Sequence, residues 1–305
     1  MATLVNEALG VVFVHIPKSA GTSVTRTFEA HSAPDPETPL TDAERQANPR
    51  LWSHWVQGDH LPGIEASVAH NVGMQGGREK VPAFHARAVD LRHALGYRRF
   101  DALHSFTFVR NPFERMASTY HYTRDNDANP HAAMCRVLGF EQYIVFNCML
   151  TVQLQYDWLH DLNGRPMVDE VFRVEHMAEA EARLGARLFG KPIRFVHENQ
   201  STNARRDPST SWNAVPEWVI DLFVKTYAKD FACTGYATDV SPYKTADVTS
   251  EEAASGAWER LPQYLAHPVE RSMQRRYYLD RLRYITTLDR GENVAGSASG
   301  DTVAG

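Results

Sequence analysis

A chain of 305 residues can form one large α/β domain or two ordinary ones, and its hydrophobic (43 %) and charged (23 %) fractions are typical of a globular protein. The net charge of −5 argues against a general nucleic-acid binder, and no apolar run is long enough to span a bilayer. The N-terminus lacks the basic segment of a signal peptide, and three widely spaced cysteines fit neither a zinc site nor a disulfide framework. These features predict a soluble protein of the reducing cytoplasm.

The stretch 11–27 predicts a strand, a tight turn and a helix. The apolar run at 11–16 is typical of a buried parallel strand, Pro17 ends it, and a helix is expected over 22–30. Small residues in the turn let the backbone approach an anion, and the new helix directs its free N–H groups and positive dipole end at that anion. We therefore predict a phosphate-binding loop in which Lys18 adds a mobile charge. An ordinary strand–turn–helix is the alternative.

A second strand–turn–helix is expected further along the chain. The connecting segments before it are an exposed excursion, an irregular region rich in His, Gly and Trp, and a short helix (32–50, 51–87 and 88–95). Residues 104–110 form an apolar strand that ends at Arg110, and Pro112 suits the first turn of the next helix. Ligands bind at the carboxyl ends of strands in open α/β sheets, so Arg110 and Ser118 are placed to hold a second phosphate. The two units together predict a nucleotide with phosphates at two separate positions.

Helices and strands continue to alternate in the rest of the chain. The expected elements are a long buried helix, a strand, a helix, a short strand, a polar loop and an amphipathic helix, at 140–162, 167–175, 177–188, 193–196, 197–211 and 215–231. The pattern predicts an α/β fold of three layers, with helices flanking a central parallel sheet, in a domain of residues 1–240. A C-terminal helical extension over 241–290, with a helix at 268–286, is expected to pack on this core, and the Gly/Ser-rich tail 291–305 is expected to be disordered.

The pattern differs from that of an ordinary nucleoside triphosphatase. Such an enzyme needs a glycine–lysine pair at the end of its loop and a magnesium-binding carboxylate at the end of another strand. Here Lys18 precedes Gly21, and the second strand ends in Arg110 rather than an aspartate. This arrangement disfavours ATP or GTP hydrolysis and predicts a site that requires no metal.

Six segments in collinear order resemble the carbohydrate sulfotransferases of the sulfotransferase-2 type. The sequence HIPKSAGTS (His15–Ser23) is similar to the family's 5′-phosphosulfate loop, and FTFVRNPFERMASTYHY (Phe106–Tyr122) is similar to its 3′-phosphate motif. Further similarity is found at 84–96, 168–177, 197–203 and 227–236. The resemblance implies a P-loop-like fold and the donor 3′-phosphoadenosine 5′-phosphosulfate (PAPS). The implied reaction is sulfuryl transfer to a hydroxyl of a carbohydrate or glycolipid acceptor, with release of 3′-phosphoadenosine 5′-phosphate (PAP).

The resemblance also implies roles for individual residues. Lys18 matches the family lysine that neutralises the leaving group, and Arg110 and Ser118 match the ligands of the 3′-phosphate. The 5′-phosphate is expected to bind the loop residues Ser19, Ala20, Gly21, Thr22 and Ser23. Ser201 and Asn203 lie in a polar loop that matches a segment closing over the nucleotide. Two alternatives stay open, because Thr22 can instead be a helix N-cap and Arg115, in the second motif, can instead brace its helix.

The base that removes the acceptor's proton is expected among the histidines, which titrate near neutrality. His85 is favoured because related glycosaminoglycan enzymes carry a catalytic histidine at about this place, upstream of the Arg110 motif. His60 is the second candidate, whereas structural or surface roles are favoured for His54 and His70. Asp59 also remains a candidate, because a carboxylate serves as the base in other sulfotransferases.

The acceptor-binding residues are expected in the variable loops 32–87 and 120–140. Trp52, Trp55 and Trp158 are candidates for stacking on sugar rings, although core packing is favoured for Trp158. The family often has a basic residue where Gln200 stands, and Arg205 and Arg206 either compensate for it or bind an anionic acceptor.

Two other functions remain alternatives to sulfuryl transfer. The first is a kinase-like phosphotransferase, which the missing magnesium carboxylate disfavours. The second is a non-catalytic nucleotide-binding partner protein, which the presence of Lys18, Arg110 and Ser118 disfavours.

Overall fold

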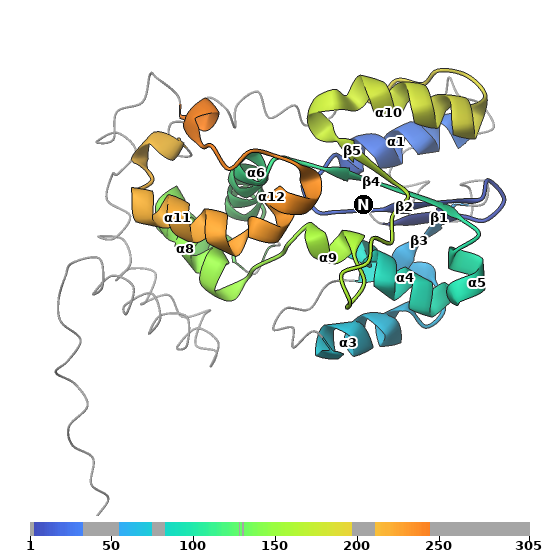
Figure 1. Ribbon diagram of the computed structural model, residues 1–305, viewed down its shortest axis with the longest axis horizontal. Helices are drawn as coiled ribbons and strands as arrows, with labels where there is room; N and C mark the ends of the chain where they lie inside the picture. The colour runs from blue at the N-terminus through green and yellow to red at the C-terminus, as the bar shows by residue number, and fades with distance from the viewer. Residues whose placement is uncertain are drawn as a thin grey trace, which may run out of the picture.

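The computed structural model describes residues 3–32, 55–74, 83–127, 129, 131–196 and 211–244. A five-stranded sheet lies at its centre, with the strand order β3-β1-β2-β4-β5 (Figure 1). The strands are β1 (Leu4–Asn6), β2 (Val11–Val14), β3 (Val56–Gln57), β4 (His104–Val109) and β5 (Glu170–Arg173). The parallel arrangement of β2, β4 and β5 confirms the predicted core of the sheet. The two other strands were not predicted, and they extend the sheet beyond β2 in antiparallel pairing.

Helices cover both faces of this sheet, which confirms the predicted three-layer fold. Figure 1 shows α1 and α10 on one face and α4, α5 and α9 on the other. The bounds of these helices, with that of the neighbouring α3, are α1 (Gly21–Ser32), α3 (Ile64–Met74), α4 (Ala88–Leu95), α5 (Tyr97–Phe100), α9 (Tyr156–Leu159) and α10 (Met177–Leu184).

The alternation of side chains along β2 explains why both faces are covered. Val11 and Phe13 are buried in the core shared with α1 and α10, whereas Val12 and Val14 are buried in the core shared with α3 and α4. A strand with apolar residues on both faces is stable only between two layers, as the apolar run at 11–16 predicted.

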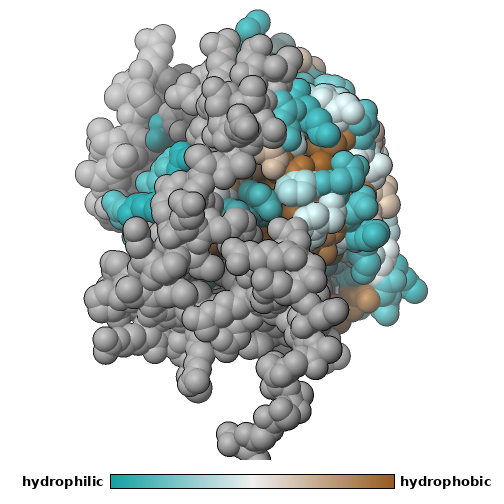
Figure 2. Space-filling view, turned by 90° about the vertical axis from the view of Figure 1, so that its left-hand side faces the viewer, coloured by the Kyte–Doolittle hydropathy of each residue, from teal (hydrophilic) through white to brown (hydrophobic). Residues whose placement is uncertain are grey.

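A third core belongs to a group of helices beyond the carboxyl end of β4 (Figure 1). The group consists of α6 (Pro112–Asp125), α7 (Ala132–Val137), α8 (Phe140–Leu150), α11 (Glu217–Thr226) and α12 (Ala228–Thr234). Phe113, Phe146 and Phe223 are among its fully buried side chains. Figure 2 views this side of the molecule, where a small apolar area lies between hydrophilic residues on the coloured part of the surface.

Short turns of helix complete the described elements. They are the 3-10 turns Gly58–His60, Ala83–His85, Val174–His176, Trp212–Ala214 and Ser241–Tyr243, and the π turn Gly185–Phe189 that follows α10. Within the described ranges, no helix has the length and apolar composition needed to cross a membrane.

The prediction of one helix over 140–162 was wrong. The chain leaves α8 at Leu150, and α9 begins only at Tyr156. The Asn147 amide donates to the Thr151 carbonyl at 3.3 Å and so caps the end of α8. The break is also stabilised from a distant segment, because the Asp230 carboxylate accepts the main-chain N–H groups that open α9.

Two further element predictions need correction. Residues 215–231 form two helices, since α11 ends at Thr226 and α12 begins at Ala228. Residues 193–196 are not a strand, although Ile193 and Phe195 are buried. The main-chain N–H groups of Phe195 and Val196 donate to the side chains of Glu181 and Thr27 instead of to a neighbouring strand.

The helix predicted at 268–286 and the tail 291–305 lie outside the described residues. The same holds for nearly all of the extension expected over 241–290 and for residues 197–210 of the polar loop.

Candidate active site

The loop between β2 and α1, residues 15–20, is named the phosphate loop after its predicted role, and its backbone is unusual. Lys18 (φ 67°) and Ala20 (φ 59°) adopt the left-handed conformation, which residues with a Cβ rarely adopt. The Ser19 N–H between them donates to the Ile16 carbonyl at 3.2 Å. Backbone strain of this kind persists only where the surroundings enforce it, and it is frequent at ligand-binding sites. It turns the chain sharply into the N-terminus of α1, whose first N–H groups have no partner within the helix.

The start of α1 settles the alternative role of Thr22. The Ala20 carbonyl accepts the N–H of Val24 at 3.1 Å, so the helix is already formed at Gly21. Thr22 therefore lies inside the first turn, and the N-cap alternative was wrong.

Gly21 is explained by the side chain of His15. A Cβ built on Gly21 would lie 1.7 Å from Nε2 of His15, so no larger residue fits here without displacing the imidazole. The His15 ring is buried, stacks on Phe13 at 5.6 Å between ring centroids, and meets the edge of His85 at 4.5 Å. The glycine is thus required by a close approach, and the ring packs directly behind the loop.

The second unit also forms as predicted. β4 ends at Val109, the Asn111 side chain accepts the Phe113 N–H at 2.9 Å, and Pro112 is the first residue of α6. Arg110 follows the strand directly, and its Nε lies 3.4 Å from the Glu114 carboxylate. Ser118 is buried one turn further along α6 than Glu114.

Arg115 joins the two units. Its Nε donates to the Pro17 carbonyl at 3.1 Å, and its Nη1 donates to the Gln153 carbonyl at 2.7 Å. The guanidinium therefore holds the phosphate loop against α6 and the segment before α9. The sequence predicted at most a brace for the helix of Arg115, whereas both of these contacts reach outside that helix.

Lys18 lies in a positively charged environment. Burial is the main cause that lowers its pKa from 10.5 to about 8, and the nearby charges of Arg110 and Arg115 add to the effect. Its Nζ lies 4.1 Å from the ring centroid of Tyr122, which is half exposed. Three cations that destabilise one another in this way are suited to bind a polyanion.

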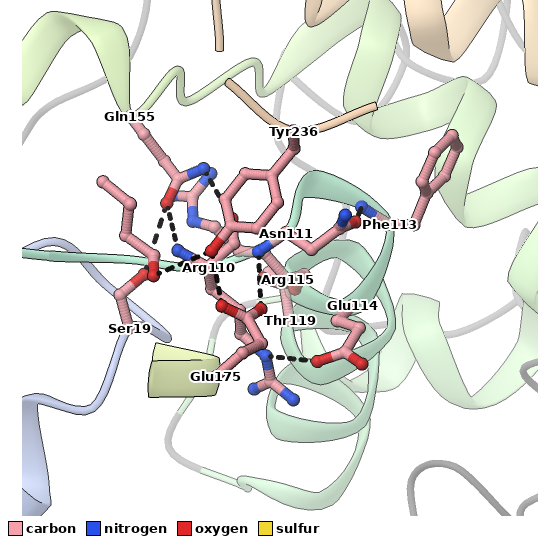
Figure 3. A network of polar contacts seen from close by, with 11 residues as sticks. Ser19, Arg110, Asn111, Phe113, Glu114, Arg115, Thr119, Gln155, Glu175 and Tyr236 are labelled. Atoms are coloured by element: carbon pink, nitrogen blue, oxygen red, sulfur yellow. Dashed lines mark hydrogen bonds and ion pairs between the residues drawn. The ribbon is translucent and has the colours of Figure 1, made fainter. Parts of the chain in front are cut away.

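Gln155, which the sequence did not single out, links both units (Figure 3). Its side-chain amide forms a pair of hydrogen bonds with the main chain of Arg110, accepting from N and donating to O, both at 2.9 Å. The Ser19 hydroxyl donates to the same amide oxygen at 3.4 Å. Because residue 155 was expected inside a continuous helix, nothing in the local sequence marked it.

Glu175 and Tyr236 stabilise the end of β4 from the other side. One carboxylate oxygen of Glu175 accepts the Asn111 N–H at 3.1 Å, and the other accepts the Tyr236 hydroxyl. Glu175 is the second residue after β5, so a carboxylate does lie near the strand ends, but both of its oxygens bond to the protein. The matches at 168–177 and 227–236 contain Glu175 and Tyr236, and they were the sequence signal for these two residues.

The candidate histidines lie in different environments. His85 is largely buried beside His15, its carbonyl accepts from Trp158 Nε1 at 2.9 Å, and burial lowers its pKa from 6.5 to about 3. His60 and His70 are exposed, on the turn Gly58–His60 and on α3. His85 therefore contacts the His15 ring, and it is the His15 ring that packs behind the phosphate loop.

The tryptophans and the polar loop complete the predicted residues. Trp55 and Trp158 are both buried, and Trp55 stacks on Phe28 at 5.1 Å, so core packing accounts for them. The remaining predicted residues, Trp52, His54, Gln200, Ser201, Asn203, Arg205 and Arg206, lie outside the described residues.

The comparison with protein families agrees with this geometry. The model of the sulfotransferase family matches residues 1–153, which contain the phosphate loop and the β4–α6 unit. The comparisons with curated proteins and with solved structures gave no match. The match extends over half of the chain, and the chain belongs to the sulfotransferase family.

Proposed function

We propose that this sulfotransferase transfers a sulfuryl group from PAPS to a hydroxyl of a carbohydrate or glycolipid acceptor by in-line displacement. The observation that carries the proposal is the convergence of Lys18, Arg110 and Arg115 on the left-handed turn at the start of α1. These cations come from two separate units, the loop before α1 and the start of α6. A donor with phosphates at both the 5′ and the 3′ positions supplies one anionic group for each unit.

The two units have separate tasks in this proposal. Main-chain N–H groups of the turn and of the first helical turn bind the 5′-phosphosulfate, with contributions from Ser19, Ala20, Gly21, Thr22 and Ser23. Arg110 and Ser118 bind the 3′-phosphate. The contact of Arg110 with Glu114 is made by Nε, which leaves the two Nη groups of the guanidinium as donors for the 3′-phosphate. Ser201 and Asn203 in the polar loop are proposed to close over the nucleotide.

Lys18 is the residue proposed to stabilise the leaving group. PAPS supplies the sulfuryl group when bound, and the departing phosphate oxygen gains negative charge as the bond to sulfur breaks. An ammonium held in a largely buried position interacts more strongly with that charge than it would in water. Arg110 and Arg115 repel the Lys18 ammonium, and the negative charge of a bound anion would offset this repulsion.

His85 is the proposed general base, with His60 as the second candidate. Burial keeps the His85 imidazole neutral at physiological pH, and the same burial makes it a weak base in the nucleotide-free protein, with a pKa of about 3. The negative charges of a bound donor would raise the pKa of His85 toward the neutral range.

Isothermal titration calorimetry with PAP and ATP tests the donor assignment. We expect tight PAP binding and weak ATP binding, because ATP lacks the 3′-phosphate. Equal affinity for the two nucleotides would contradict the proposal and favour a phosphotransferase.

Transfer of labelled sulfate from PAPS to a panel of glycans and glycolipids tests the reaction. We expect activity that persists in EDTA and falls about 10²–10³-fold in Lys18→Ala, which loses one transition-state contact. Unchanged activity in Lys18→Ala would refute the catalytic role, and a requirement for Mg²⁺ would favour the phosphotransferase.

Three unpaired cysteines, at positions 135, 148 and 233, fit the proposed cytoplasmic location.

A further inference from the structure

We propose that Gln155 is a positioning residue that couples the two phosphate-binding units, so that an anion held by one unit raises the affinity of the other. The inference rests on the proposed binding of a nucleotide with 5′ and 3′ phosphates. It concerns a residue that lies two positions beyond the part of the chain matched by the family model.

The first argument is the geometry of the amide at Arg110. Gln155 is fully buried, and its side chain pairs with the peptide groups of Arg110 as a neighbouring strand would, with one bond in each direction at 2.9 Å. Arg110 has already left β4, so it has no partner from the sheet ladder there. The amide therefore defines the main-chain position from which the Arg110 side chain projects.

The second argument is that one oxygen serves both units. Oε1 of Gln155 accepts the Arg110 N–H at 2.9 Å and the Ser19 hydroxyl at 3.4 Å. Ser19 is fully buried between the two left-handed residues of the loop, so its side chain cannot turn to water. A shift of the loop toward a bound phosphate must therefore move or break a bond to the atom that also holds Arg110 (Figure 3).

The third argument is that Gln155 is held from outside the site. The Asp230 carboxylate accepts the N–H of Gln155 at 3.0 Å and that of Tyr156 at 2.9 Å, so α12 fixes the start of α9. Arg115 also makes a side-chain hydrogen bond to the loop, but it binds the Pro17 carbonyl and not the peptide of Arg110. Gln155 is thus placed to transmit a displacement from the loop to the end of β4.

Calorimetry with three nucleotides tests the coupling. The dissociation constants of adenosine 5′-phosphate, adenosine 3′-phosphate and PAP are measured for the wild type and for Gln155→Ala. We expect the gain in affinity from adding the 3′-phosphate to adenosine 5′-phosphate to fall about tenfold in Gln155→Ala, since two buried hydrogen bonds to Arg110 are lost. The affinity for adenosine 5′-phosphate alone should change by less than about threefold.

Gln142→Ala is the matched control, because Gln142 is a buried glutamine of α8 whose Oε1 accepts no hydrogen bond from the described residues. It should leave all three affinities at the wild-type values. If Gln155→Ala does not fold, Gln155→Met preserves the volume of the side chain and removes the same bonds. An equal weakening of all three nucleotides, or an unchanged gain from the 3′-phosphate, would overturn the inference.

Hydrogen exchange separates this inference from the proposed function. In the nucleotide-free protein the Arg110 amide should exchange about tenfold faster in Gln155→Ala than in Gln142→Ala, because its acceptor has been removed. Wild-type protein that binds no PAP would refute the proposed function and the coupling together, whereas the exchange rate would still report whether Gln155 holds Arg110. Equal exchange rates in the two variants would refute the positioning role alone.

Discussion

At the scale of single residues, the phosphate loop is defined by contacts that composition does not reveal. Gly21 belongs to a motif in which a glycine is expected for its backbone freedom, yet its φ angle is not positive. What excludes a side chain is the His15 imidazole, at 1.7 Å from the position of a Cβ. The loop and the ring behind it therefore form one packed unit.

Gly21→Ala should lower the free energy of unfolding by about 2–3 kcal/mol, because the new methyl group must displace a buried ring. Urea denaturation measures the change. The same substitution in a His15→Ala background should cost much less, since the colliding ring is gone. Gly190→Ala is the control: its added Cβ would meet nothing within 4 Å, so only the strain of its φ of +63°, about 1–2 kcal/mol, remains. Similar losses from Gly21→Ala in both backgrounds would contradict the explanation.

Lys18→Met should make the protein inactive and more stable, by about 1 kcal/mol at pH 7, because it removes a buried charge beside two arginines. The pKa of Lys18 is about 8 in the folded state and 10.5 in the unfolded chain, so between these values the unfolded chain binds more protons. The wild type therefore gains stability as pH rises from 8 to 10.5, and the advantage of Lys18→Met should shrink across that window. Urea midpoints at several pH values measure both effects, and an advantage independent of pH would contradict this assignment of the charge.

At the scale of elements, the site depends on how helices begin. α9 has only four residues, and the Asp230 carboxylate accepts the N–H groups at its start. Burial raises the pKa of Asp230 to about 6, and the Arg115 charge and the two N–H donors oppose this rise. The carboxylate is therefore mostly ionised at neutral pH.

Asp230→Ala should lower the free energy of unfolding by about 2–3 kcal/mol, because two buried N–H groups lose their acceptor. Asp239→Ala is the matched control, as Asp239 accepts the Ser241 N–H at 2.9 Å on the exposed surface. It should cost less than about 1 kcal/mol. Equal losses of unfolding free energy in the two variants, measured by urea denaturation, would contradict the stabilising role of Asp230 at the start of α9.

Element prediction from the sequence succeeded where a pattern was local. The apolar runs ending before Pro17 and at Arg110 identified β2 and β4, and the helix starts after them were correct within about two residues. The helix over 140–162 was wrong because its interruption is capped by Asp230, which lies 75 residues away in the sequence. β1 and β3 have three and two residues, too few for an alternating pattern to be visible.

At the scale of the whole molecule, two buried histidines link the phosphate loop to global stability. Burial lowers the pKa of His15 well below 6.5 and that of His85 to about 3. The unfolded chain therefore binds more protons than the folded protein as pH falls from 6.5 toward 3, and stability must fall with it.

We expect the free energy of unfolding to drop by up to about 1.4 kcal/mol per pH unit for each histidine in this range. His85→Asn should make the decline shallower, whereas His176→Asn, at an exposed position, should leave it unchanged. Urea denaturation between pH 4 and 7 measures the slopes. An identical slope in the wild type and His85→Asn would contradict a neutral, buried His85.

The sequence predicted the candidate site only in part, because some of its residues are brought together only by tertiary contacts. Lys18 and Arg110 were found because each follows an apolar strand in a motif, and their proximity follows from the pairing of β2 with β4. Gln155 could not be found in this way, because its role depends on tertiary contacts with Ser19 and Arg110. Glu175 and Tyr236 were matched as parts of segments, without roles.

The position of Asp230 and Tyr236 near the end of the described chain has a consequence for biosynthesis. Both predicted phosphate-binding units leave the ribosome before several of the residues that stabilise them, since Gln155, Glu175, Asp230 and Tyr236 all follow α6 in the sequence. A nascent chain that has exposed only its first 153 residues contains both units and the Arg115 contact between them, but it lacks the bonds from Gln155 and Glu175 to the end of β4. The end of β4 and the start of α9 therefore gain their last stabilising bonds only late in synthesis, after Tyr236 has emerged.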